Sequence, residues 1–382
     1  MDAGLAYGLV WAGYIAYLGF LAAAPRLRPR LVWALIGALV LAFALTPVLL
    51  SHDVFSYVDY ARLGVRHGLD PYVHAPNTAR ADPAFAEVTW TGTPSVYGPL
   101  FTLLTYPLAW LSVDAAVAVL KAAAALSVLG LALLVARLAA WRGADPRRAA
   151  AFVALNPLVL VHVVGGAHND GLAMLVAMLG AAALLARREA SAGAALLAAA
   201  AIKASALLLA PFALAATARP SRKRASPRIA WSTADSRGRG LARLGAGALA
   251  AAVALGVAAY LAFGWDWTHA FGLAGENQSR TSHLSIPVTL ARLTGLGDGP
   301  VRAAALLLYA AALAGLLAWT WRGGDWLRAA GWAALGLLLA TSWLLPWYLI
   351  WALPLAAVAR DRLLALLVLA LTAYQLGARI PL

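Results

Sequence analysis

The sequence predicts an all-α protein of the polytopic membrane class, a bundle of roughly 10–12 transmembrane helices formed by residues 1–382 as a single domain. Hydrophobic residues make up 63% of the chain and charged residues only 12%. Several apolar runs are long enough to cross about 30 Å of hydrocarbon at about 1.5 Å per helical residue. The Arg and Lys residues lie mostly between these runs, so the net charge of +14 indicates orientation in the membrane rather than binding of nucleic acid.

The first two apolar runs, residues 4–24 and 31–50, set the orientation of the chain. Between them lies RLRPR, residues 26–30, whose three arginines are expected on the cytoplasmic side. The N-terminus and residue 51 are then extracytoplasmic. The first run lacks a positive leading segment and carries Asp2 instead, so we interpret it as a retained span rather than a cleaved signal peptide.

A polar loop, residues 51–98, follows on the outer side and holds five of the sixteen acidic residues of the chain. Its first part, residues 53–67, places apolar and polar side chains at helical spacing ahead of Gly68, which is typical of an amphipathic helix in the outer interface. Asp53 stands where an N-cap belongs. Capping is therefore one interpretation of this aspartate, and catalysis is the other.

Positive charges order the rest of the chain in the same way. Counting forward predicts three more spans, at 114–136, 149–164 and 171–186. Counting backward from the C-terminus places the loop 264–300 outside and the loop 217–243 inside. The loop 217–243 holds eight basic residues and is rich in Ser, Pro and Gly, which is typical of a disordered linker.

The two countings conflict at the apolar run 191–216, because Arg187 before it and the basic loop after it are both assigned to the cytoplasm. A helical hairpin with its apex at residues 200–206 resolves the conflict. Each arm then has about a dozen residues and reaches roughly 18 Å, short of the full bilayer, and Lys203 at the apex points into a cavity open to the outer side. The alternative is one long span with Lys203 near its middle, at a cost of roughly 2.5 to 3.5 kcal/mol unless the lysine is paired.

Polar residues also gather at the start of the span that follows GGAHND. Helix capping explains one of His168, Asn169 and Asp170, but three adjacent polar groups exceed what one cap needs. A metal site would need further ligands, and no metal-ligand spacing is present. The chain contains no cysteine, which excludes disulfides and thiolate chemistry. We therefore expect no metal here.

Two later stretches are predicted on the same outer face. ENQSRTSH contains Arg280 and His283, whose polarity an ordinary solvated loop also explains. LPWY contains Trp347 and Tyr348, which fit either an interfacial aromatic belt or a surface on which a sugar stacks. Tyr97, in SVYGPL, fits interfacial anchoring as well.

Six stretches stand out in a fixed order along residues 45–360: SHDVFSYVDYARLGVRHGLDPY, YGPL, GGAHNDGLAML, AAIKASALLLAPF, HLSIPVTLARL and LPWYLIWALPLA. Together they resemble the bacterial polyprenyl-phosphate-mannose-dependent alpha-1,6-mannosyltransferases, the MptA/MptB-like family of the GT-C superfamily of integral-membrane glycosyltransferases. The resemblance implies a GT-C fold in which a large first external loop, containing interfacial helices, bears the catalytic aspartate. It also implies a donor sugar carried on polyprenyl phosphate. Asp53 matches that aspartate, and Lys203 matches a lysine near the donor phosphate.

Elementary chemistry gives these residues roles. A sugar hydroxyl is a poor nucleophile near neutral pH, so a carboxylate within hydrogen-bond reach should accept its proton, and we assign this role to Asp53. Lys203 and Arg280 are expected to stabilise the negative charge that develops on the leaving phosphate. A single displacement inverts the anomeric centre, so a beta-linked donor gives an alpha product. The residues expected to bind substrate are Tyr57, Tyr97, His168, Asn169, Asp170, His283, Trp347 and Tyr348.

The expected function is transfer of a sugar, mannose by the resemblance, from polyprenyl phosphate to an extracytoplasmic glycan or lipoglycan at the plasma membrane. The lipid-linked donor is a substrate, and we expect no cofactor. The alternatives are a transporter or flippase, for which an intramembrane lysine is typical, and a lipid-linked glycan ligase or polymerase. The acidic residues gather in a loop rather than at the bilayer midplane, and no inverted repeat is evident, which favours a transferase over a transporter.

Overall fold

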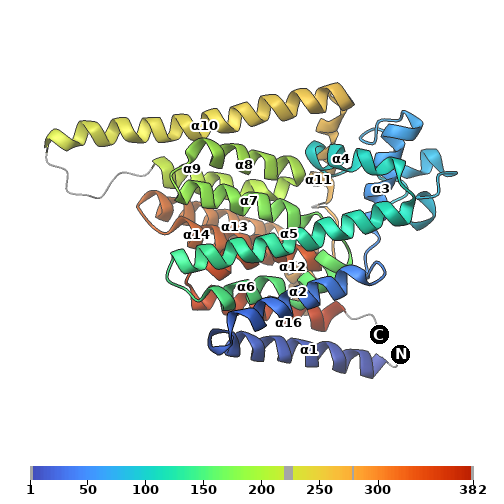
Figure 1. Ribbon diagram of the computed structural model, residues 1–382, viewed down its shortest axis with the longest axis horizontal. Helices are drawn as coiled ribbons and strands as arrows, with labels where there is room; N and C mark the ends of the chain where they lie inside the picture. The colour runs from blue at the N-terminus through green and yellow to red at the C-terminus, as the bar shows by residue number, and fades with distance from the viewer. Residues whose placement is uncertain (1–2, 219–226, 278, 380–382) are drawn as a thin grey trace.

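The protein is a bundle of helices that mostly run along one direction (Figure 1). The computed structural model describes residues 3–218, 227–277 and 279–379. Within these residues all regular structure is helical, which confirms the predicted all-α class. The longer helices are α1 (Ala3–Ala23), α2 (Pro29–Leu45), α3 (Asp53–His67), α5 (Val113–Trp141), α7 (Asp170–Leu185), α8 (Glu189–Ile202), α10 (Pro227–Phe263), α13 (Asp298–Trp321), α14 (Trp326–Ala340) and α16 (Arg362–Arg379). The shorter elements are η1 (Ala24–Arg26), η2 (Pro76–Ala79), η3 (Phe85–Glu87), α4 (Pro99–Thr105), η4 (Tyr106–Trp110), α6 (Pro146–Ala154), η5 (Val159–Gly165), η6 (Ala204–Leu209), α9 (Ala210–Ala218), η7 (Asp266–Thr268), α11 (His269–Asn277), α12 (Ile286–Thr294), η8 (Pro346–Trp351) and α15 (Leu353–Val358).

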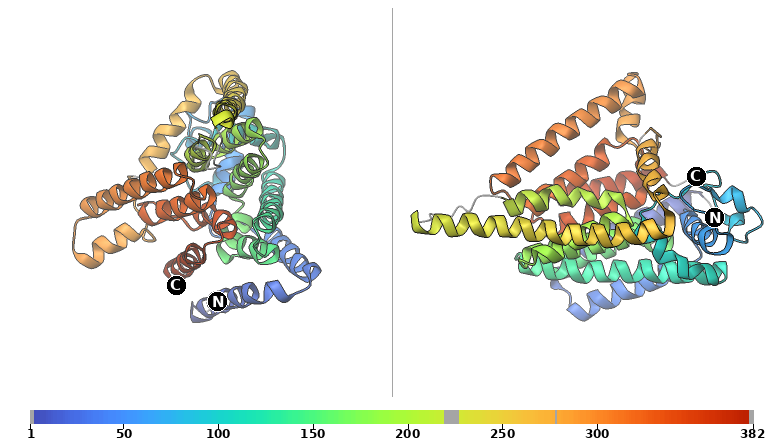
Figure 2. Two further views of the ribbon diagram at one scale, coloured as in Figure 1. Left: turned by 90° about the vertical axis from the view of Figure 1, so that its left-hand side faces the viewer. Right: turned by 90° about the horizontal axis from the view of Figure 1, so that it is seen from above.

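Several of these helices fit a membrane. Among the described residues, four are long and apolar enough to cross one, namely Gly8–Arg26, Val113–Trp141, Gly238–Phe263 and Asp298–Trp321. The bent pair of α6 and η5 is a fifth candidate, and seven further helices of 10–17 residues are also apolar. Helix α13 diverges from α10 and buries only Thr320, which leaves its apolar surface free to face lipid (Figure 2). The protein is thus a polytopic helical bundle, while the count of roughly 10–12 crossings stays a prediction.

The span expected at 149–164 is broken. Helix α6 ends at Ala154, and η5 continues at an angle of 64°. The break follows from Pro157, which has no backbone N–H to donate to the preceding turn. Asn156 supports the bend, because its side chain accepts from the Leu158 N–H at 3.0 Å and donates to the Thr372 hydroxyl at 3.1 Å. The segment expected to span the membrane at 149–164 is therefore bent, and an Asn-Pro pair is a typical signal for such a break.

The connections that carry arginines meet at one end of the bundle. Arg147 donates to the Leu27 carbonyl at 2.9 Å, and Arg142 donates to the Val358 carbonyl at 2.6 Å. The connections after α1, α5 and α15 therefore lie together, whereas α3 and α4 lie at the opposite end (Figure 1). The structure separates arginine-rich connections from the acidic loop 51–98, which is the arrangement that the charge pattern predicts.

The chain from Glu189 to Ala218 forms a hairpin. Helix α8 runs to Ile202, Lys203 follows with an extended backbone, and η6 and α9 return. The two ends lie together, because a Cβ added to Gly240 of α10 would meet Thr217 at 3.4 Å and Glu189 at 4.0 Å. This geometry excludes the single long span and places Lys203 at the apex, as the hairpin interpretation predicts.

The second part of the predicted linker 217–243 is helical. Residues 227–243 begin α10, while residues 219–226 lie outside the described residues. Pro227 at the first position favours a helix start, and the helix continues into the alanine-rich part of α10 after residue 243, so disorder is the wrong expectation for 227–243.

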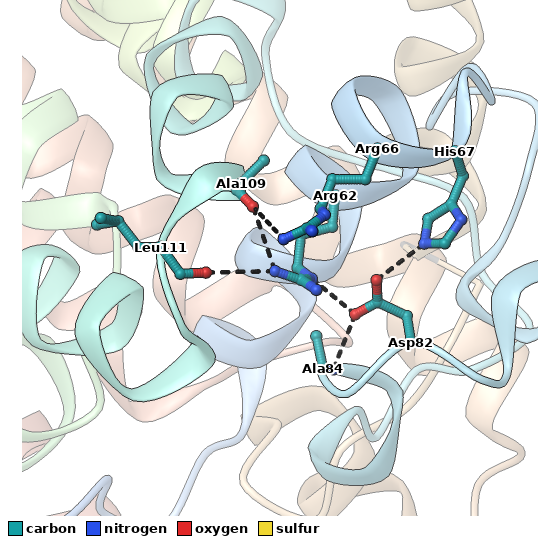
Figure 3. Close-up of polar contacts among 7 residues, drawn as sticks. All are labelled: Arg62, Arg66, His67, Asp82, Ala84, Ala109 and Leu111. Carbon is teal, nitrogen blue, oxygen red and sulfur yellow. Dashed lines mark hydrogen bonds and ion pairs between the residues drawn. The ribbon is translucent and has the colours of Figure 1, made fainter.

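Helix α3 has the predicted bounds, since it starts at Asp53 and ends where Gly68 adopts a left-handed φ of +63°. Asp59 and Arg62 on its polar side are buried because the loop folds back over them, whereas Arg66 and His67 at its end are exposed. Arg62 donates to Asp82 at 2.7 Å and to the carbonyls of Ala109 and Leu111 at 3.2 and 3.3 Å (Figure 3). A ring nitrogen of His67 lies 2.8 Å from the same aspartate. This network fixes the loop 51–98 on η4.

Candidate active site

A cavity of about 560 Å³ lies at the start of α3. Its walls come from segments that are far apart in the chain. The lining residues are Leu50, Ser51, His52, Asp53, Tyr60, Thr89, Trp90, Thr93, Val96, Tyr97, Lys203, Ala204, Ser205, Arg280, Leu337, Thr341, Trp343, Leu345, Trp347, Tyr348 and Trp351. The predicted base, both predicted phosphate ligands and the predicted aromatic residues of LPWY therefore share one cavity.

Asp53 is presented by a tight connection between α2 and α3. The Leu49 N–H donates to the Gly165 carbonyl at 3.2 Å, and Leu50 adopts a left-handed φ of +59°. The N-cap position of α3 belongs to His52, and the Asp53 carboxylate instead accepts a hydrogen bond from Trp90 Nε1 at 3.1 Å. The interpretation of Asp53 as the cap of this helix was therefore wrong, and its carboxylate is directed to the cavity.

The electrostatic environment makes Asp53 a better base than an exposed aspartate. Burial raises the pKa of the Asp53 carboxyl, and the Trp90 hydrogen bond and the Lys203 charge offset this only in part, so the pKa stays above its ordinary value. A carboxylate with a raised pKa accepts a proton more readily near neutral pH. His168 Nδ1 lies 3.8 Å from Asp53 Oδ2.

The residues of GGAHND lie behind the cavity wall. Asn169 takes the N-cap position of α7 without a side-chain capping bond. His168 is buried and stacks on Trp347, with ring centroids 3.8 Å apart and planes 19° apart. Asp170 is fully buried and accepts from Lys203 Nζ at 2.6 Å and from Trp351 Nε1 at 2.7 Å. The polar groups thus hold parts of the site together across the bundle rather than cap their own helix.

Lys203 reaches the cavity from the hairpin apex. Its ammonium lies 5.4 Å from the ring centroid of Tyr348, and its side chain is 18% exposed. The turn YGPL packs against the apex, because the Gly98 N–H donates to the Ile202 carbonyl at 3.3 Å. A Cβ at Gly98 would lie 2.1 Å from the Ala201 carbonyl oxygen, so only glycine permits this approach.

The segment 264–300 contributes Arg280 but not His283. The Arg280 guanidinium lies 5.0 Å from the ring centroid of Trp90 and 6.0 Å from that of Trp343. Ser282 turns inward and donates to the Leu344 carbonyl at 2.8 Å. The next side chain, His283, consequently points outward and is exposed, so the structure does not bring it into the cavity.

The two predicted tyrosines of the loop 51–98 differ in position. Tyr97 lines the cavity, whereas Tyr57 is buried behind it and packs edge-on against Tyr97, with centroids 4.7 Å apart. A direct contact of Tyr57 with substrate therefore does not fit this geometry. Among the described residues, no group of three or more His, Asp or Glu side chains is placed to hold a metal ion.

Trp90 was missed by the sequence reasoning. Its only distinguishing signal is an indole N–H donor in the same loop as Asp53, and the two residues are 37 positions apart. No helical or strand periodicity connects positions at that separation, so the pairing could not be read from spacing.

Comparison with known proteins identifies the family. Residues 3–219, more than half of the chain, match the family model described as alpha-(1->6)-mannopyranosyltransferase, N-terminal domain. The chain belongs to this alpha-(1->6)-mannopyranosyltransferase family. The matched region includes Asp53, Trp90, Asp170 and Lys203, whereas Arg280 and the aromatic segment 343–351 come from the remainder.

Curated members of the mannopyranosyltransferase family are similar over parts of their length. Alpha-(1->6)-mannopyranosyltransferase A of Corynebacterium glutamicum is 29% identical over 157 residues, which cover 40% of this chain and 31% of the relative. Alpha-(1->6)-mannopyranosyltransferase A of Mycobacterium tuberculosis is 38% identical over 137 residues, covering 33% and 26%. A probable alpha-(1->6)-mannopyranosyltransferase of Mycolicibacterium smegmatis is 29% identical over 358 residues, covering 82% and 62%. The alignments thus span less than two thirds of each relative, and no solved structure matches the chain.

Proposed function

We propose that the protein is a membrane-bound mannosyltransferase that transfers mannose from a polyprenyl-phosphate donor to an extracytoplasmic glycan or lipoglycan, forming an alpha-1,6 linkage. The observation that carries the proposal is that the Asp53 carboxylate and the Lys203 ammonium line one cavity. A base and a cation that line one cavity are what a glycosyl transfer from a phosphate leaving group requires.

In the proposed reaction, an acceptor hydroxyl attacks C1 of the mannosyl group while Asp53 takes up the hydroxyl proton. The bond between C1 and the phosphate oxygen breaks, and its electron pair leaves with polyprenyl phosphate. Lys203 and Arg280, which both line the cavity, stabilise the negative charge on that phosphate. Attack opposite to the leaving group converts a beta-linked donor into an alpha-linked product.

The side of the membrane on which the cavity opens is inferred from the positions of the arginine-rich connections. The arginine-rich connections lie at the end opposite to the cavity, and such connections favour the cytoplasmic side of the plasma membrane. The cavity then opens at the extracytoplasmic face. A polyprenyl-phosphate sugar presents its head group at the level of the lipid head groups, which is where a cavity at a bundle end is accessible.

The test is transfer from radiolabelled polyprenyl-phosphate mannose by the purified protein. Asp53→Asn keeps the size of the side chain but removes the proton acceptor, so we expect turnover to fall by at least about 100-fold with an unchanged melting temperature. Asp298→Asn is the matched control, because Asp298 is exposed and lies outside the cavity. Absence of a new mannosidic bond with wild-type protein would contradict the proposal and favour a transporter or flippase. Product made by Asp53→Asn at the normal rate would exclude Asp53 as the base.

A further inference from the structure

We propose that Trp90 is a positioning residue that orients the Asp53 carboxylate for proton transfer, and that Arg280 holds Trp90 in that position. The inference rests on the proposed function, because it assigns a partner to the base of that reaction. It adds a dependence of the base on the segment 264–300, in which Arg280 lies 227 positions after Asp53.

The indole of Trp90 contacts the carboxylate of Asp53. Trp90 Nε1 donates to Asp53 Oδ1 at 3.1 Å, and both residues line the cavity. An indole has a single donor and no acceptor, so this bond fixes one carboxylate oxygen and cannot reverse its direction. The other oxygen, Oδ2, then remains to accept a proton from the acceptor hydroxyl. The side chain of Asp53 is 15% exposed and lines the cavity, so the carboxylate is partly accessible from it.

Arg280 supports Trp90 from the face of its ring. The Arg280 guanidinium lies 5.0 Å from the Trp90 ring centroid and 6.0 Å from that of Trp343. Cations are attracted to the faces of indole rings. Arg280 therefore bridges the loop 51–98 and the aromatic segment that starts at Trp343, and it fixes the plane of the ring whose edge contacts Asp53.

The backbone that carries Arg280 is itself anchored by hydrogen bonds. Two residues further on, Ser282 donates its backbone N–H to the Ser342 carbonyl at 2.9 Å and its hydroxyl to the Leu344 carbonyl at 2.8 Å. Ser285 donates its hydroxyl to the Thr341 carbonyl at 3.0 Å. The backbone that carries Arg280 is thus tied to the same wall of the cavity as Trp343. Displacement of this segment would move Trp90 and hence the carboxylate.

Other groups also act on the ionisation of Asp53 and have to be held constant in a test. The titratable or charged residues that act on it from its own helix and from neighbouring elements are Tyr57, Tyr60, Tyr97, His168, Asp170, Lys203 and Tyr348. None of these is changed by a substitution at Trp90. Loss of the indole N–H removes a bond to the ionised carboxylate, so the pKa of Asp53 should rise.

The decisive variant is Trp90→Phe, which keeps an aromatic ring at this position, although a smaller one, and removes the N–H donor. The pH profile of kcat/KM for transfer from polyprenyl-phosphate mannose is measured together with kcat and KM. We expect kcat to fall by about 10-fold to 100-fold, the KM for the donor to stay within about twofold, and the acidic limb of the profile to move to higher pH. Trp90→His restores a ring N–H, so we expect it to recover part of the lost kcat.

The matched control is Trp332→Phe. Trp332 Nε1 donates to Asp361 Oδ2 at 2.9 Å, the same kind of bond, but neither residue lines the cavity. We expect this variant to keep the wild-type kcat and pH profile. Melting temperatures of all variants separate a folding defect from a change in the base.

The outcomes are distinct. If wild-type protein and Trp90→Phe share the same kcat and acidic limb while Asp53→Asn is inactive, Trp90 does not position the base and the inference fails alone. If Trp90→Phe raises KM and leaves kcat and the acidic limb unchanged, Trp90 is a stacking surface for a sugar, and the inference again fails. If wild-type protein forms no mannosidic bond, the proposed function fails and the inference falls with it.

Discussion

Lys203 and Asp170 form an ion pair in which Nζ lies 2.6 Å from Oδ2, and the aspartate side chain is fully buried. The second oxygen of Asp170 accepts from Trp351. A buried carboxylate with two donors is well satisfied, but removal of either donor would leave charge without a partner. The pair therefore fixes the ammonium at the cavity while one side of it remains accessible to an anion.

Lys203→Met should abolish transfer and lower the free energy of unfolding by about 3 kcal/mol, because Asp170 is left buried without its cation. The double variant Lys203→Met with Asp170→Asn should regain most of that stability but no activity. Thermal unfolding in detergent, measured beside the transfer assay, checks both statements. His269→Asn is the control, because the His269 and Asp266 side chains, 3.9 Å apart, are 60% and 48% exposed, and such a surface pair is worth about 0–1 kcal/mol. Recovery of activity by the double variant would show that Lys203 serves the fold alone.

Gly98→Ala should separate the YGPL turn from the hairpin apex. The added Cβ would lie 2.1 Å from a backbone carbonyl oxygen, which cannot move aside as a flexible side chain would. We expect a loss of about 2 kcal/mol or more in the free energy of unfolding and a fall in turnover, because the backbone next to Lys203 shifts. Gly92→Ala in the same loop is the control, since its Cβ would meet no atom closer than 4.0 Å. Equal melting temperatures for the two variants would contradict this account.

Asp59→Asn should stabilise the protein at alkaline pH. Burial and the neighbouring Asp82 raise the pKa of Asp59 to about 7, from an ordinary value of 3.8. Because the folded state binds this proton more tightly than the unfolded state, the stability it contributes is lost as pH rises from about 4 through 7. The melting temperature of Asp59→Asn should therefore exceed that of the wild type by at least about 2 °C at pH 8 and by less at pH 5. A difference that does not change with pH would show that Asp59 does not titrate in this range.

Two features of the fold could be predicted from charge alone. Arg187 before the apolar run 191–216 and the basic loop after it were both assigned to the cytoplasm, so the run had to return to the side of the membrane from which it started. The run is long enough only for two short arms, which allows such a return. The structure has that hairpin, with Lys203 at its apex. The separation of acidic and arginine-rich connections follows from the same rule. Charge counting works here because it depends only on the order of segments along the chain.

The partners of the polar residues could not be predicted. Asp53 and Asn169 stand at helix starts, where capping is the local expectation, but tertiary contacts take precedence over it. The bond from Trp351 to Asp170 joins positions 181 apart. Such contacts depend on how the helices pack, and a single sequence contains no period at that distance.

The order in which the chain is made gives the Arg62 network a further consequence. Arg62 donates to the carbonyls of Ala109 and Leu111 as well as to Asp82, so the loop 51–98 cannot reach its final shape until η4 has left the ribosome. The cavity beside Asp53 is still incomplete at that point, because the wall that carries Trp347 is synthesised almost three hundred residues after that aspartate. The nascent protein therefore lacks a complete cavity wall until η8 has been synthesised, and chains that terminate before η8 cannot form the proposed site.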